Sequence, residues 1–228
     1  MTPAAREAIE KSDVVVGYTV YVDLVRDLCG GKKVESTGMK KEVDRCRLAL
    51  DHALAGETVA FVCSGDAGVY GMAGIMSEVA EEHPEVEIET VAGITAACSG
   101  AAVLGAPLIH DFAVISLSDL LTPWETIEKR VRMAAEADFV LVIYNPKSKK
   151  RRDYIDKAAA YVSEARPWDT PCGYVKNIGR EGERAVVCTL KDLVNNDDID
   201  MFTTIFIGNR QTRVINGRLV TPRGYRGI

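Results

Sequence analysis

The sequence predicts an α/β protein built from two α/β domains, with a parallel sheet in the first and a mixed sheet in the second. In the first half, short apolar runs alternate with amphipathic stretches, which is typical of a parallel α/β sheet. In the second half, several apolar runs follow one another without an intervening helix, which favours a mixed sheet. Because the pattern restarts after Pro107, we expect domains over residues 1–111 and 112–228.

The elements of the first domain follow from periodicity and from turn residues. A helix opens at once, because Thr2 suits an N-cap and Pro3 suits the first helical position. Apolar runs predict strands at residues 14–17, 58–63 and 86–91, and amphipathic patterns predict helices near residues 19–29, 41–55 and 71–82. Residues 94–105 are small and apolar all round, which indicates a buried helix packed closely against its neighbours.

The second domain is predicted in the same way. We expect strands at residues 113–117, 139–144, 172–175, 185–188 and 203–207, with helices near residues 123–137 and 152–165. Asn216-Gly217 lies between two short β-type runs and predicts a hairpin over residues 213–221.

Composition excludes several classes of protein. The 228 residues carry a net charge of −5, which argues against a general nucleic-acid binder. The six cysteines form no C-x-x-C pair, so neither a zinc site nor a disulfide framework is indicated, and no other metal site is expected. No apolar run approaches the roughly 18 residues of a membrane helix, and no signal peptide is recognisable, so we expect a cytoplasmic protein.

Two glycine-containing turns in the first domain are candidate ligand loops. Ser64-Gly65-Asp66 directly follows a predicted strand, and Gly68 and Gly71 delay the next helix. Glycines let bare backbone approach a ligand, and the carboxylate of Asp66 can accept hydrogen bonds from a hydroxyl or an amine. An ordinary strand-to-helix loop explains the same residues. Gly93-Ile94-Thr95 follows another predicted strand, where Thr95 either caps the next helix or helps to bind a ligand.

Three candidates lie in or near the second domain. Ser118 and Asp119 follow a strand end, where open α/β sheets bind ligands, although a turn role is also open. Five basic residues lie within residues 147–152; they form either a solvated helix start or a site for a polyanionic ligand. His110, beside Asp111, is either structural or an oriented acid or base.

Taken in order, these motifs resemble those of the S-adenosylmethionine-dependent tetrapyrrole methylases. The likeness rests first on Ser64-Gly65-Asp66, then on Gly93-Ile94-Thr95-Ala96, then on Ser116-Leu117-Ser118-Asp119. It extends over nearly the whole chain through Leu104-Gly105-Ala106-Pro107-Leu108, Tyr144-Asn145-Pro146 and Thr212-Arg213-Val214-Ile215-Asn216-Gly217. Each motif alone is weak, but their order and spacing are specific, and they are most similar to the branch that methylates ring carbon 17.

The resemblance implies a homodimer that holds S-adenosylmethionine and a tetrapyrrole in a cleft between its two domains. The cofactor-binding residues that match the family motifs are Ser64, Gly65, Asp66, Val69, Thr95, Ala96, Asn145, Ile178 and Thr204. The implied reaction methylates carbon 17 of a precorrin-3B or cobalt-precorrin-3 type tetrapyrrole and contracts the ring, in cobalamin biosynthesis. The acidic substituents of that substrate suit Ser118, Lys147, Lys149, Lys150 and Arg151, and either Asp119 or His110 is expected to assist proton transfer.

One departure from the family concerns the start of the chain. Members of the family begin with a strand and a Gly-x-Gly-Pro-Gly-Asp-Pro type loop before the helix that corresponds to residues 3–11, and we expect that this sequence starts late. Three alternatives remain: a related methylase with another substrate or target position, a dinucleotide-dependent oxidoreductase, and a non-catalytic tetrapyrrole carrier. The second requires G-x-G-x-x-G after the first strand, and the sequence does not have it there.

Overall fold

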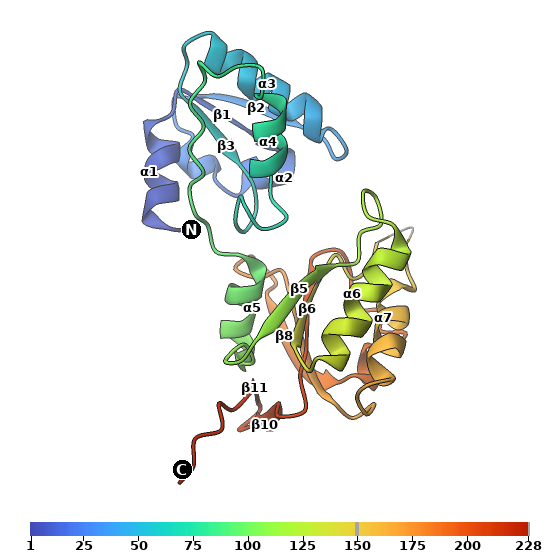
Figure 1. Ribbon diagram of the computed structural model, residues 1–228. Coiled ribbons are helices and arrows are strands. Elements are labelled where there is room, and N and C mark those ends of the chain that lie inside the picture. The colour runs from blue at the N-terminus through green and yellow to red at the C-terminus, as the bar shows by residue number, and fades with distance from the viewer. Residues whose placement is uncertain (149–150, 228) are drawn as a thin grey trace. The chain divides into compact units, whose positions relative to one another are not determined.

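The protein, seen in a computed structural model that describes residues 1–148 and 151–227, divides into two compact units (Figure 1). Unit 1 comprises residues 1–95 and unit 2 comprises residues 96–228. The sequence-based boundary after Asp111 lies within unit 2, because the helix α5 (Ala96–Leu104) packs on the sheet of that unit. No helix among the described residues is both long enough and apolar enough to span a membrane.

Unit 1 contains a parallel sheet, as the sequence predicts, but one of its three strands, β2 (Lys33–Thr37), lies where no strand is predicted. The strand order is β2 (Lys33–Thr37), β1 (Val14–Tyr18), β3 (Val59–Val62), and both neighbours run parallel to β1. Alternate residues of β1 face opposite sides of the sheet. Val14 and Val16 pack against α3 (Glu42–Leu54) and α4 (Ala73–Val79), whereas Val15 packs with residues of α1 (Pro3–Lys11) and the 25–29 segment.

The start of α1 is formed as predicted, because the Thr2 hydroxyl accepts a hydrogen bond from the Ala5 backbone N–H. The helix expected over residues 19–29 is instead two short pieces, α2 (Thr19–Asp23) and the 3₁₀ turn η1 (Arg26–Leu28). Thr19, Val20 and Val22 are β-branched, which lowers helix propensity over this stretch.

The strand predicted over residues 86–91 is wrong. This segment is non-helical and belongs to no β-ladder. A strand is defined by hydrogen bonds to a neighbour, and within the described residues β3 pairs only with β1. The apolar alternation of Val86 and Ile88 therefore does not show whether a partner strand is available.

Unit 2 is built on a five-stranded mixed sheet, which confirms the mixed sheet that the sequence predicts for the second domain. Its order is β5 (Phe112–Ser116), β6 (Val140–Tyr144), β9 (Thr203–Ile207), β7 (Pro171–Lys176), β8 (Arg184–Thr189). Only β5 and β6 run parallel to each other, and the remaining neighbours are antiparallel. The carboxyl ends of β5 and β6 consequently lie at the same edge of the sheet.

Helices cover both faces of this sheet (Figure 1). On one face, α6 (Trp124–Glu136) and α7 (Tyr154–Ser163) bury residues such as Ile127 and Ile155. On the other, α5 approaches closely, because a Cβ on Gly100 would lie 2.9 Å from the Phe206 ring. The small residues of this helix thus serve close packing, as the sequence indicates.

The chain ends in a small separate sheet. The predicted hairpin is present as β10 (Arg213–Ile215) and β11 (Arg218–Val220), and β11 also pairs in parallel with β4 (Gly105–Ala106). Asn216 and Gly217 have φ of 50° and 75°, the two positive values that a type I′ turn requires.

A buried arginine links four parts of unit 2. Arg166 is 3% exposed, and its guanidinium donates to the carbonyl oxygens of Gly208 and Phe139 at 2.6 Å each. It also donates to the carbonyls of Ala134 and Ala135 near the end of α6, which lack partners within the helix. Burial lowers the pKa of the Arg166 side chain, since few solvent dipoles stabilise its charge.

Candidate functional site

The loop after β3 is held by the carboxylate of Asp66. One oxygen, Oδ1, accepts from the Gly68 backbone N–H at 2.8 Å, and Oδ2 accepts from the Gly93 N–H at 2.8 Å. The Gly93 and Gly68 donors favour the charged carboxylate and therefore lower the pKa of Asp66. Asp66 thus joins two loops that lie 27 residues apart in the sequence.

Glycine is required where these two loops meet. A Cβ on Gly93 would lie 2.0 Å from the carbonyl oxygen of Gly65 and 3.0 Å from the Asp66 Cα, so any side chain would push the backbones apart. Gly65 itself has a φ of 79°, which glycine adopts without steric cost. Both turns are recognisable in the sequence, but their contact is visible only in the structure.

The other residues predicted for the cofactor in unit 1 lie close to this junction in the chain. Ser64 precedes Gly65 and is exposed, Val69 follows Gly68 and is partly buried, and Thr95 lies two residues after Gly93. The structure therefore brings Gly65, Asp66 and the Gly93 turn together.

In unit 2, polar residues gather where the parallel strands β5 and β6 end. Asn145 follows β6, and its Nδ2 donates to the Oγ of Ser116, the last residue of β5, at 2.9 Å. Asn145 has a φ of 50°, a left-handed conformation that asparagine tolerates better than most residues. The Ser118 backbone N–H also donates to Ser116 Oγ. The hydrogen bond between Asn145 and Ser116 joins the ends of the two strands.

Asp119 lies at the centre of a second hydrogen-bonded group at this edge. Its Oδ1 is 2.7 Å from Arg151 Nε, and its Oδ2 accepts from the Tyr154 hydroxyl at 2.6 Å. Arg151 also donates through Nη1 to Ser118 Oγ at 3.2 Å. The structure thus brings together Ser118, Asp119 and Arg151 and adds Tyr154, which no spacing in the sequence marks as functional.

The basic residues within 147–152, called the basic run below, differ in how they contribute to this edge of the sheet. Lys147 donates through Nζ to the Asn196 carbonyl at 3.0 Å and lies 3.9 Å from Asp197 Oδ1, so its ammonium group already has partners. Lys149 and Lys150 lie outside the described residues.

The remaining predicted cofactor residues lie on the α5 side of the unit 2 sheet. Ala96 begins α5, and the next residue, Ala97, donates its N–H to the Tyr144 hydroxyl at 2.7 Å. Ile178, after β7, lies close to α5, because a Cβ on Gly100 would be 2.9 Å from its Cδ1. Thr204 is buried in β9 and shares the α5-facing side with Phe206, two residues further along.

His110 is not part of the Asp119 group. It precedes β5, whereas Asp119 follows that strand, and the five residues of β5 separate the two ends by roughly 16 Å. Its Nε2 is buried and has no hydrogen-bond partner among the described residues.

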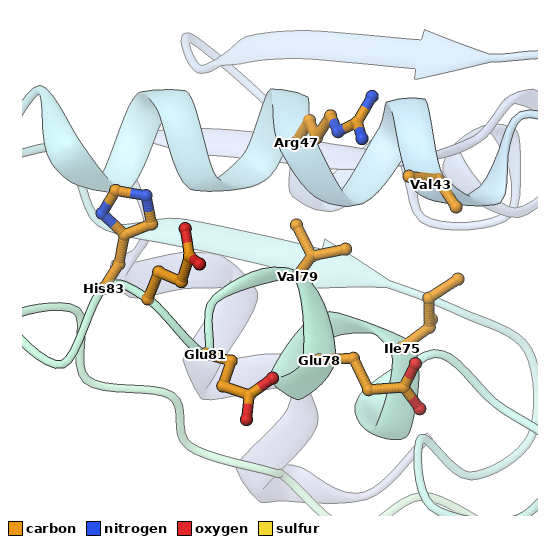
Figure 2. Close-up of a pocket in the computed structure, with 8 residues that line it drawn as sticks. Val43, Arg47, Ile75, Glu78, Val79, Glu81 and His83 are labelled. Atoms are coloured by element: carbon orange, nitrogen blue, oxygen red, sulfur yellow. The ribbon is translucent and has the colours of Figure 1, made fainter.

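A pocket with a volume of about 460 Å³ lies elsewhere, between α3 and α4 of unit 1. Figure 2 shows Val43 and Arg47 on α3 facing Ile75 and Val79 on α4. None of the residues predicted for a site lines it. The gap is open and lies on the helical face of the sheet, whereas open α/β sheets bind ligands beyond the carboxyl ends of their strands. Geometry therefore favours the strand-end loops.

The fold and these loops define a class, an α/β protein that holds a small-molecule ligand at the carboxyl ends of its strands. The family model for "Tetrapyrrole (Corrin/Porphyrin) Methylases" matches residues 1–194. The chain belongs to this family, whose members take the methyl group from S-adenosylmethionine.

Several proteins of this family are similar to nearly the whole of this chain. A probable cobalt-factor III C(17)-methyltransferase of Salmonella typhimurium is 45% identical over 226 residues, covering 99% of this chain and 93% of the relative. A cobalt-factor III methyltransferase of Priestia megaterium is 48% identical over 231 residues, and this chain spans 43% of its length. The crystal structure of the methyltransferase CobJ matches with a TM-score of 0.90 and 35% identity, covering 97% of this chain and 93% of that one.

Proposed function

We propose that the protein transfers a methyl group from S-adenosylmethionine to ring carbon 17 of a precorrin-3B or cobalt-precorrin-3 type tetrapyrrole, with ring contraction, in cobalamin biosynthesis. In the transfer step a ring carbon attacks the sulfonium methyl, so a carbon–carbon bond forms and the carbon–sulfur bond breaks. S-adenosylhomocysteine leaves as a neutral thioether, and the substrate loses a proton. Placement of donor and acceptor supplies much of the rate in such a displacement.

The observation that carries this proposal is the likeness to a C(17)-methyltransferase over 99% of the chain. The loops described above support it, because they offer rigid backbone in unit 1 and fixed polar groups in unit 2. We propose that the cofactor contacts Ser64, Gly65, Asp66, Val69, Thr95, Ala96, Asn145, Ile178 and Thr204. Asp66 supports cofactor binding mainly by holding its loop in place, since both of its oxygens already accept backbone hydrogen bonds.

We propose that the substrate carboxylates contact Ser118 and Arg151, with the lysines of the basic run nearby in the sequence. For the proton transfer we favour Asp119 over His110. Asp119 lies with Ser118 and Arg151, whereas His110 lies at the other end of β5.

The test is to incubate the protein with S-adenosylmethionine and each candidate tetrapyrrole, metal-free or cobalt-containing, and to measure the product masses. We expect a gain of one methyl group on one of these substrates and strongly reduced turnover in Asp119→Asn. Methylation of a different tetrapyrrole would support a related methylase instead. No mass gain on any tetrapyrrole, together with tight binding of NAD in calorimetry, would refute the methylase function.

We further propose that the protein is a cytoplasmic homodimer. Light scattering coupled to size-exclusion chromatography tests the dimer, because a mass equal to one chain would contradict it. Fractionation of the producing cells tests the location.

A further inference from the structure

Tyr154, the first residue of α7, connects that helix to the loop after β5. Its hydroxyl donates to Asp119 Oδ2 at 2.6 Å, while Arg151 Nε lies 2.7 Å from the other carboxylate oxygen. Each oxygen of Asp119 therefore has its own donor, and both donors belong to the segment that follows β6 in the sequence. Hydrogen bonds to a charged group are about twice as strong as neutral ones.

The Tyr154 ring is itself held in place. Its centroid lies 4.3 Å from that of Trp124 in α6, at an interplanar angle of 43°. The Lys157 ammonium lies 5.2 Å from the Tyr154 centroid and 5.6 Å from that of Trp124. The hydrogen bond to Asp119 raises the pKa of Tyr154, so its hydroxyl remains a proton donor over the neutral range.

The loop that carries Asp119 has few other anchors. Residues 118–123 form neither helix nor strand, and the side chains of Leu120 and Leu121 are 65% and 98% exposed. A loop with such exposed side chains samples many conformations unless something restrains it. The contacts of Asp119 with Arg151 and Tyr154 supply that restraint.

We propose that Tyr154 is a positioning residue, which holds the Asp119 carboxylate and with it the Arg151 guanidinium in the orientation that the tetrapyrrole substrate requires. This inference rests on the proposed function. Arg151 contacts Asp119 through Nε and Ser118 through Nη1, so fixing Asp119 also fixes the direction of the guanidinium. A guanidinium that is already oriented binds a substrate carboxylate with a smaller loss of conformational entropy.

The test compares Tyr154→Phe with Tyr161→Phe. Tyr161 is a matched control, because it lies on the same helix and in the same aromatic cluster, but its hydroxyl accepts from Trp124 Nε1 at 3.2 Å. We expect Tyr154→Phe to lower kcat/KM for the tetrapyrrole by about tenfold or more, as for loss of a hydrogen bond to a charged group. The KM for S-adenosylmethionine should stay unchanged in both variants, and Tyr161→Phe should keep the wild-type kcat/KM.

A double-mutant cycle separates positioning from a general structural effect. In an Asp119→Ala background, Tyr154→Phe should have little further effect on kcat/KM, because both changes remove the same hydrogen bond. Full additivity, or wild-type kinetics of Tyr154→Phe, would overturn the positioning role while leaving the proposed function intact. A wild-type protein that methylates no tetrapyrrole would refute the proposed function itself and, with it, this role.

Discussion

Replacement of Gly93 by alanine tests whether the two glycine loops of unit 1 form one rigid junction. The added Cβ would lie 2.0 Å from the Gly65 carbonyl oxygen, and its three nearest neighbours are all backbone atoms, which cannot rotate away. Overpacking of this kind costs about 1–3 kcal/mol. If the Gly93 N–H then moves out of reach of Asp66, loss of that charge-assisted hydrogen bond costs about 1.5–3 kcal/mol more. We therefore expect Gly93→Ala to lower the free energy of unfolding of unit 1 by about 3–5 kcal/mol.

The assay is equilibrium unfolding in urea, followed by far-ultraviolet circular dichroism and by tryptophan fluorescence. Both tryptophans, Trp124 and Trp168, lie in unit 2, so a change confined to unit 1 should appear in the dichroism but not in the fluorescence. Gly74→Ala is the control, because Gly74 lies in α4 with no atom near its added Cβ, and alanine favours a helix. Calorimetry should show weaker binding of S-adenosylmethionine to Gly93→Ala only. Unchanged stability and binding in Gly93→Ala would show that the junction is not rigid.

Three further predictions follow from charged groups with defined partners. Asp66→Asn should destabilise unit 1 at pH 7, but the difference in unfolding free energy from wild type should shrink in acid. Because the pKa of Asp66 is lowered in the folded state, its contribution to stability is fully present above about pH 4 and is lost as the pH falls through the folded-state pKa. Denaturation at a series of pH values would show this loss. Arg166→Met should lower the free energy of unfolding of unit 2 by about 3–5 kcal/mol, because four carbonyls each lose a hydrogen bond from a charged donor, and a fluorescence midpoint equal to wild type would contradict this. Asp119→Asn should bring the raised pKa of Tyr154 back toward its ordinary value; absorbance titration of the phenolate, with the Tyr154→Phe spectrum subtracted, checks the shift, and an unchanged titration would contradict it.

Most of the fold could be predicted from the sequence because local patterns there agree with the tertiary contacts. The helix α3 lies within one residue of its predicted ends, since its apolar spacing and Gly56 both mark it. The segment 86–91 was mispredicted because apolar alternation does not reveal whether a partner strand is available. The 19–29 stretch is two short turns and not one helix, because its β-branched residues lower helix propensity, which the apolar pattern alone does not reveal.

The candidate site was predictable in its loops but not in its connections. Position after a strand end was enough to mark Asp66 and Asp119, whereas Asn145 was marked by the resemblance to the methylase family. Their partners, however, come from distant segments: Gly93 lies 27 residues from Asp66, and Tyr154 lies 35 residues from Asp119. Such pairs depend on how strands are ordered in the sheet, and no local spacing encodes that order.

The two acidic residues share one physical arrangement. In each unit, an aspartate just after a parallel strand has both carboxylate oxygens bonded to donors, which for Asp66 are the backbone N–H groups of Gly68 and Gly93 and for Asp119 are the side chains of Arg151 and Tyr154. A carboxylate with one donor on each oxygen restricts the loop that carries it, and it keeps further lone pairs for a ligand or a proton. Substitution of either residue by alanine should therefore weaken ligand binding by loosening a loop. For that reason a variant that keeps the loop in place but alters the charge, such as Asp119→Asn, tells more about the chemistry than alanine does.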